Sequence, residues 1–201
     1  MAVGAQLSKD GVTREREMNS LSLVTVIVIL ATVTMTFGAM IAVFFYRSLA
    51  PRFWGHLKIS PILWLTTAIL VVSSFTFEKA RQRLAQNDQI GFHRLIRWTT
   101  GLAVAFLVGQ AAAGFQILHS GVVLANNPHS WFIFLFSGLH GIHIVAGLIG
   151  LAYLLIRTKE PASGPRFQMT TRVVARSVSI CWHYLDFLWL LMFTLLLLWK
   201  R

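Results

Sequence analysis

Five polar side chains that could ligate a metal, carry a proton or form strong hydrogen bonds occur within apolar stretches of this sequence. His140 and His143 stand three residues apart in SGLHGIHIVAGLIG, and His183 and Asp186 have the same spacing in WHYLDFLW. The fifth is Gln110, in FLVGQAAAGF. Residues three apart lie on the same face of a helix, so each pair would point two polar groups in one direction.

The composition predicts that these stretches are membrane-spanning helices. Of 201 residues, 56% are hydrophobic and 12% are charged, whereas a soluble domain has about 25% charged residues. Apolar segments close to or above the roughly 20 residues needed to span a bilayer occupy about 20–46, 61–78, 95–118, 131–156 and 173–199. We therefore expect an all-α integral membrane protein, with a polar tail at 1–19 and a single five-helix membrane domain at 20–201. The polar first twenty residues contain no apolar core typical of a cleavable signal peptide.

The distribution of Lys and Arg predicts the topology. Thirteen basic residues flank one face of the five segments, and five flank the other. Since basic residues concentrate on the cytoplasmic side, the N-terminus is expected in the cytoplasm and the C-terminus in the periplasm. The net charge of +11 would suggest nucleic-acid binding in a soluble protein. Here the basic residues cluster at the ends of apolar segments, so no nucleic-acid partner is expected.

The predicted depths bring the polar residues to one level. His143 lies 13 residues from the cytoplasmic end of the fourth segment, and Asp186 lies 13 residues from the same end of the fifth. At about 1.5 Å per residue, both are about 20 Å into the membrane, and Gln110 is close to the same depth. A charged Asp near the bilayer centre is costly, so Asp186 should point inward toward the histidines. We predict an interhelical polar clasp of Gln110, His140, His143, His183 and Asp186.

Three roles are open to these groups. Hydrogen bonds between them would fix the register of the helices, which is the favoured interpretation. Alternatively, the three histidines and Asp186 could fill four positions of a metal or haem site, or could form a proton path. Of the other polar residues, Glu78 is expected to pair with Arg81 and to do nothing more. Cys181 is expected to act as a small buried hydrophobic residue.

Small residues predict where helices approach closely. Gly101, Ala105, Gly109 and Ala113 recur at every fourth position of the third segment. Such a row allows a neighbouring backbone to come near, and packing is the expected role. In the fourth segment the same role is expected of Gly138, Gly141, Gly147 and Gly150.

Four motifs, which follow one another along the chain as they do in the family, resemble subunit III of the haem–copper terminal oxidases. GLHGIHIVAG is similar to the family's Gly-Phe-His-Gly-x-His-Val-x-x-Gly, and WHYLDFLW is similar to its Trp-His-Phe-Val-Asp-x-x-Trp. LWLTTAILVVSSFTFEKA resembles the family's second-span motif, and FFYRSLAP resembles the end of the family's next-upstream helix. The residues that carry the likeness are Gly138, His140, Gly141, His143, Gly147, Trp182, His183, Asp186, Trp189, Thr67, Ser73, Ser74, Thr76 and Ala80.

The resemblance implies a non-catalytic subunit of a proton-pumping respiratory oxidase in the bacterial plasma membrane. Such a subunit packs on the catalytic subunit I near a proton-uptake channel, protects the oxidase from inactivation during turnover, and holds phospholipid in a cleft. Subunits I and II are the expected partners; haem and copper are expected in partner subunits and not in this chain. The resemblance is to the short five-helix bacterial form, which lacks the two N-terminal helices of longer members.

The chain departs from the family pattern at two carboxylates. The family often carries a Glu six residues before the glycine that corresponds to Gly38, where this chain has Thr32. The family's Gln-x-x-Glu reads Gln110 to Ala113 here. A role in proton delivery that needs those acids is therefore not expected.

Alternatives remain open at the level of the complex. The chain could belong to a quinol oxidase or accompany a nitric-oxide reductase. A membrane metal or haem protein that uses the four clasp residues is a different class. A small transporter is a third class, but the segments show no internal repeat or paired broken helices.

Overall fold

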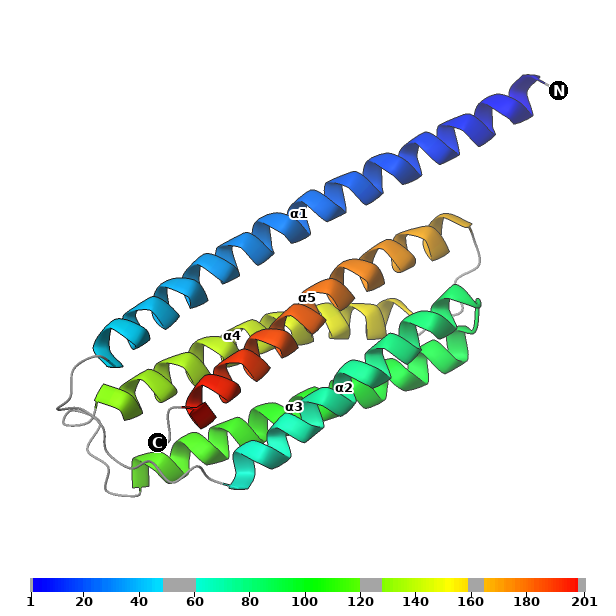
Figure 1. Cartoon of the computed structure of the whole chain (residues 1–201). Helices are drawn as coiled ribbons and strands as arrows, with labels where there is room; N and C mark the ends of the chain where they lie inside the picture. Colours follow the sequence, from blue (N-terminus) through cyan, green and yellow to red (C-terminus); the bar gives the residue numbers. More distant parts are fainter. Residues whose placement is uncertain (1, 49–60, 120–127, 159–164, 199–201) are drawn as a thin grey trace.

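The computed structural model describes residues 2–48, 61–119, 128–158 and 165–198, which form five helices (Figure 1). They are α1 (Ala2–Ser48), α2 (Pro61–Ala85), α3 (Gln89–His119), α4 (Pro128–Arg157) and α5 (Pro165–Leu198). Residues 49–51 of the FFYRSLAP motif lie outside the described residues, as do several basic residues used to predict the topology: Arg52, Lys58, Lys159, Lys200 and Arg201.

The all-helical, five-span prediction is confirmed. Each helix contains a segment long and apolar enough to cross a membrane: Ser20–Arg47, Pro61–Ala85, Gln89–Gln116, Phe134–Arg157 and Met169–Leu198. Prolines begin α2, α4 and α5. Proline suits the first helical position, because its fixed φ matches the helix and its missing N–H would have no partner there.

Several helices are longer than the apolar pattern predicted. α1 runs back through residues 2–19, which were expected to form a polar tail. α2 continues to Ala85 and α3 begins at Gln89, so the predicted connection between 78 and 95 is mostly helical. The added turns are rich in Lys, Arg and Gln, which favour helix but lower hydropathy. Hydropathy therefore locates the membrane-spanning part of a helix and misses its polar extension.

A tight turn joins α2 to α3. Asn87 has φ of 62°, a left-handed conformation that Asn adopts more readily than most residues. Asp88 then caps α3, because its Oδ1 accepts a hydrogen bond from the Gly91 N–H at 2.9 Å. Arg83 also pairs with Asp88, at 3.3 Å. These contacts hold α2 and α3 as an antiparallel hairpin, the most extensive helix pair of the fold.

The five helices share their contacts unequally. α2 also packs on α5, and α4 packs on both α3 and α5. α1 packs mainly on α5 and slightly on α4, and its N-terminal half diverges from the bundle (Figure 1). In α3 the inward residues alternate at spacings of four and three, as in coiled-coil packing: Phe92, Ile96, Thr99, Ala103, Phe106, Gln110 and Ala113.

Large apolar side chains cover much of the outer surface. Exposed examples occur along every helix, including Met35 on α1, Phe75 on α2 and Ile149 on α4. In water such a surface would be unfavourable, whereas in a bilayer it contacts lipid chains. The polar groups that matter for helix packing therefore lie inside the bundle.

Candidate functional site

The interior of the bundle contains a row of hydroxyl groups on α2. Thr66, Thr67, Ser73, Ser74 and Thr76 form what we call the hydroxyl ladder. Thr66, Thr67 and Ser73 are buried. Thr66 and Thr67 lie about two turns from Ser73 and Ser74, so the two groups share one face of the helix. This face meets α3 on one side and α5 on the other.

Two buried indoles of α5 donate hydrogen bonds to the hydroxyl ladder. The Nε1–H of Trp182 donates to Ser73 Oγ at 3.2 Å, and the Nε1–H of Trp189 donates to Thr67 Oγ1 at 3.0 Å. The Thr67 hydroxyl proton goes to the Leu63 carbonyl of its own helix at 2.7 Å, which leaves the oxygen as an acceptor. An indole N–H can only donate, so each tryptophan needs such an oxygen when it is buried. The two bonds fix the register of α5 against α2.

Gln110 links three helices. Its Nε2 donates to Thr66 Oγ1 of α2 at 3.2 Å, and its Oε1 accepts from Ser137 Oγ of α4 at 2.8 Å. Thr66 donates its own proton to the Leu63 carbonyl at 3.0 Å, so its oxygen is available to Gln110. Gln110 is buried, as the sequence indicated, but its partners are hydroxyls and not the predicted clasp residues.

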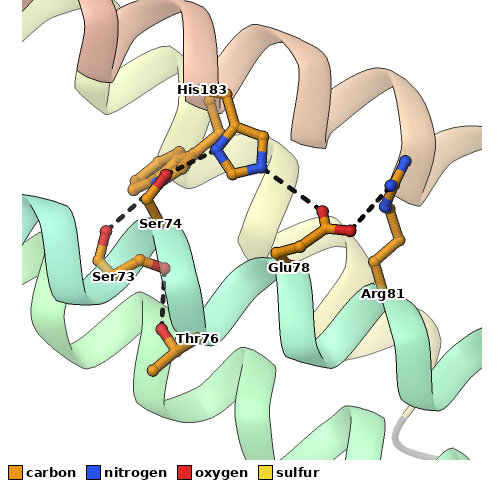
Figure 2. A network of polar contacts seen from close by, with 7 residues as sticks. Ser73, Ser74, Thr76, Glu78, Arg81 and His183 are labelled. Atoms are coloured by element: carbon orange, nitrogen blue, oxygen red, sulfur yellow. Dashed lines mark hydrogen bonds and ion pairs between the residues drawn. The ribbon is translucent and has the colours of Figure 1, made fainter.

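His183 bonds to α2, as Figure 2 shows. Its Nδ1 lies 2.6 Å from Ser74 Oγ, and its Nε2 lies 3.6 Å from Glu78 Oε2. The other oxygen of Glu78 pairs with Arg81 at 2.9 Å. The Glu78–Arg81 pair confirms one expectation, and the contact with His183 corrects the statement that Glu78 does nothing more. Near the basic end of the bundle, Glu78 thus contacts both a guanidinium and an imidazole.

The other two histidines do not bond across helices. His143 Nδ1 lies 2.7 Å from the Leu139 carbonyl of its own helix. Because a carbonyl only accepts, this ring nitrogen carries the proton. His140 is fully buried and packs its ring against Phe106 and Trp189, with centroids 5.9 and 5.1 Å away. Neither nitrogen of His140 has a hydrogen-bond partner among the described residues.

Asp186 faces the interior, with 6% of its surface exposed, but it does not bond to the histidines. Neither carboxylate oxygen has a hydrogen-bond partner among the described residues. The hydroxyl of Ser74 on α2 bonds to His183 and not to this carboxylate. The predicted hydrogen bonding between Asp186 and the imidazoles is therefore wrong. A hydroxyl of α2, that of Ser74, is the partner of His183 instead. Depth alone did not predict that the α2 hydroxyls form bonds between helices.

Some of the small residues lie at close helix contacts. A Cβ on Gly109 would come 2.4 Å from Thr66 Cγ2, and one on Gly147 would come 3.0 Å from the Trp182 ring. One on Gly150 would come 3.1 Å from Val178, and Ala113 is buried. These positions let α2 approach α3 and let α5 approach α4.

The remaining small residues are not used to pack the chain on itself. A Cβ on Gly101 or Gly138 would meet no described residue within 4 Å, and one on Gly141 would meet Leu107 only at 4.0 Å. Ala105 and Gly101 are exposed. The row from Gly101 to Ala113 therefore has two parts, of which only the later one faces another helix of this chain.

The four residues proposed as alternative metal ligands do not converge. Within the described ranges, no three His, Cys, Asp or Glu side chains are grouped closely enough to hold a metal ion. His183 points to α2, His143 bonds its own helix, and His140 is enclosed by aromatic rings. What this arrangement can do chemically is hold α2, α3, α4 and α5 together by directed hydrogen bonds.

Comparisons with known proteins agree with the motifs. A family model described as "Cytochrome c oxidase subunit III" matches residues 9–201. A "probable cytochrome c oxidase subunit 3" of Nocardia farcinica is 32% identical over 127 residues, which is 63% of this chain and 61% of that protein. The "cytochrome c oxidase subunit 3" of Synechocystis is 26% identical over 165 residues, 80% of this chain and 68% of that protein. A Corynebacterium diphtheriae protein with the same description is 28% identical over 69% of this chain and 65% of its own length. The match to the Nocardia relative thus spans less than two thirds of that relative's length.

Proposed function

Because the chain belongs to the cytochrome c oxidase subunit III family, we propose that it is a non-catalytic, stabilising subunit of a haem–copper terminal oxidase. The observation that carries this proposal is the family match over residues 9–201, nearly the whole chain. Oxygen would be reduced in subunit I, with haem and copper held by the partner subunits. This chain would pack against the catalytic subunit in a bacterial plasma membrane.

The polar interior supports a structural role. The hydroxyl ladder, two tryptophans, Gln110 and His183 form bonds that run between helices and end on side chains of this chain. Hydrogen bonds between membrane helices contribute about 0.6 kcal/mol on average, and up to about 1.7. Several such bonds hold a fixed bundle, which is what a stabilising subunit must present to its partner. Of the clasp residues, Gln110 and His183 are proposed to act within this network rather than as ligands.

The orientation follows from charge. We place the N-terminus in the cytoplasm, since Lys and Arg concentrate at the end of the bundle that contains the α2–α3 turn and the end of α4. Glu78, Arg81 and His183 then lie toward the cytoplasmic side.

The chain lacks two carboxylates that the family often carries. Their absence favours a structural role and argues against proton delivery by those two positions. Thr32 is exposed on α1 and donates its hydroxyl to the Val28 carbonyl at 2.9 Å. Ala113 is buried against neighbouring helices. Neither side chain has a carboxyl group that could take up and release a proton.

Co-purification tests the proposal. An affinity-tagged chain expressed in its own membrane should bring down a haem–copper subunit I, identified by mass spectrometry and by the haem absorption of the eluate. Deleting the gene should leave the haem spectrum of the oxidase intact and should speed its inactivation during turnover. Recovery of the chain without any haem–copper subunit would refute the assignment. A Soret band or stoichiometric metal in the isolated chain would support the metalloprotein alternative instead.

A further inference from the structure

A hollow of about 860 Å³ lies where α3 begins and α4 ends, and both of these helix ends are on the same side of the bundle (Figure 1). Its α3 wall carries His93, Arg94, Arg97 and Trp98, and Thr158, which follows α4, lines the other side. The two walls are held together, since His93 Nδ1 lies 3.3 Å from Thr158 Oγ1. The hollow is therefore a concave surface formed by two helix ends.

Two guanidinium groups in this hollow lack an acidic partner within the described parts of the chain. Arg94 and Arg97 are exposed, and neither forms an ion pair with a described acid. The acids of α2 and of the α2–α3 turn, Glu78 and Asp88, pair with other arginines. The whole chain has a net charge of +11. We therefore expect the carboxylates that match Arg94 and Arg97 on another molecule.

The rest of the lining has the character of a protein interface. Trp98 is 65% exposed and Ile90 is 77% exposed, although both side chains are large and apolar. Trp and Arg are the residues that most often dominate binding between proteins. Gln89 adds an amide, which can bond either a carbonyl or an N–H of a peptide backbone. The volume is toward the upper end of the about 300–1,000 Å³ of ligand-sized pockets, so it has room for more than one side chain.

We propose that this hollow is the docking site for an acidic segment of a partner subunit. Carboxylates of that segment contact Arg94 and Arg97, and an apolar side chain beside them packs on Trp98 and Ile90. A guanidinium group binds a carboxylate in a two-pronged geometry, and complementary charge selects an acidic partner over a basic one. The inference deepens the proposed function by naming the surface and the chemistry of the contact. It rests on that function for the expectation that the partner is an oxidase subunit.

Photo-crosslinking in native membranes identifies the molecule in the hollow. Ile90 of the full chain is replaced by p-benzoylphenylalanine, and the peptides joined to it on irradiation are identified by mass spectrometry. We expect a segment rich in Asp or Glu from an identified membrane protein. R94Q/R97Q should remove most of this product. The matched control K79Q/R176Q removes two exposed charges of α2 and α5, outside the hollow, and should leave the product unchanged.

Rebinding to the oxidase measures how much the hollow contributes. Oxidase purified from a strain that lacks this chain is titrated with the purified full chain in detergent. R94Q/R97Q should weaken binding about 3- to 30-fold and reduce its dependence on salt, because two exposed charge pairs are lost. Trp98→Ala should weaken it about 10-fold and leave the salt dependence. Every variant should keep the unfolding temperature of wild type, since the changed side chains are exposed.

The two experiments separate failure of the docking site from failure of the proposed function. Cross-links from position 90 to lipid alone, or to a segment without acidic residues, would overturn the docking site. Wild-type cross-linking and rebinding by R94Q/R97Q would overturn it as well. Oxidase that co-purifies without any cross-link at position 90 would support the proposed function and refute the docking site. An acidic segment from a protein outside the oxidase, lost in R94Q/R97Q, would support the docking site and count against the proposed function.

Discussion

The Trp189 indole donates its N–H to Thr67 Oγ1 at 3.0 Å, which joins α5 to α2 in the middle of the bundle. The same indole ring packs against His140 of α4 and lies edge-on to Phe106 of α3. One side chain thus contacts the three helices that surround it. The bond to Thr67 is the directed element among these contacts.

Thr67→Val should destabilise the chain by about 1–2 kcal/mol, because it leaves a buried indole N–H without an acceptor. Thermal unfolding in detergent, followed by tryptophan fluorescence, measures the effect. Thr67→Ser is the matched control, since it keeps the oxygen. In a double-mutant cycle with Trp189→Phe, the second change should cost less once Thr67 is already Val. Full additivity would contradict the bond.

Gly109→Ala should destabilise the contact of α3 with α2 by about 1–3 kcal/mol, because the new Cβ would lie 2.4 Å from Thr66 Cγ2. Thr66→Ser removes that methyl and keeps the oxygen that Gln110 uses, so it should restore much of the loss. Gly101→Ala, on the same helix with open space around it, should be neutral or slightly stabilising. The unfolding temperatures of Gly109→Ala, of Gly109→Ala combined with Thr66→Ser, and of Gly101→Ala decide the matter. A Gly109→Ala chain as stable as wild type would refute the close approach.

Asp186→Asn should leave the chain at least as stable as wild type. The carboxylate is buried without a hydrogen bond from any described residue, so removing its charge removes a desolvation cost and orphans no imidazole. Unfolding of the chain and the haem absorption of the assembled complex are the measurements, and the haem spectrum should not change. A loss of more than about 1 kcal/mol would show that Asp186 has an essential charged partner.

His183→Leu should destabilise the chain more than His140→Leu. His183 contacts Ser74 and Glu78 of α2, whereas His140 has no hydrogen-bond partner among the described residues and packs against aromatic rings. We expect a difference of about 1 kcal/mol, the usual size of one or two bonds between membrane helices. Parallel unfolding curves of the two variants test this, and the reverse order would mean that His140 has the stronger polar partner.

The sequence by itself determined the number and place of the membrane helices. Transfer of a segment into lipid depends on the summed apolarity of about 20 residues, and that sum can be read without any tertiary contact. Pro61 suits the first turn of α2 for a reason equally local, whereas the starts of α4 at Pro128 and of α5 at Pro165 lie before the apolar segments predicted from 131 and 173. The inward orientation of Asp186 and Gln110 could also be predicted, because an exposed polar group in lipid is costly wherever the helix packs.

Only the tertiary structure decided which polar groups meet. The antiparallel directions of α4 and α5 put Asp186 at the same depth as the histidines. A hydrogen bond also requires that the two side chains point toward each other around their helix axes, and depth does not determine that direction. His183 faces α2, and His143 bonds the backbone of its own helix. Asp186 faces the interior, and its carboxylate has no hydrogen-bond partner among the described residues. Likewise, Gly101 and Gly109 belong to the same row of small residues at every fourth position of α3. Of the two, only Gly109 has Thr66 opposite it. The rotation of each helix about its own axis is set by the packing of the whole bundle. A periodic pattern in the sequence of one helix does not predict that rotation.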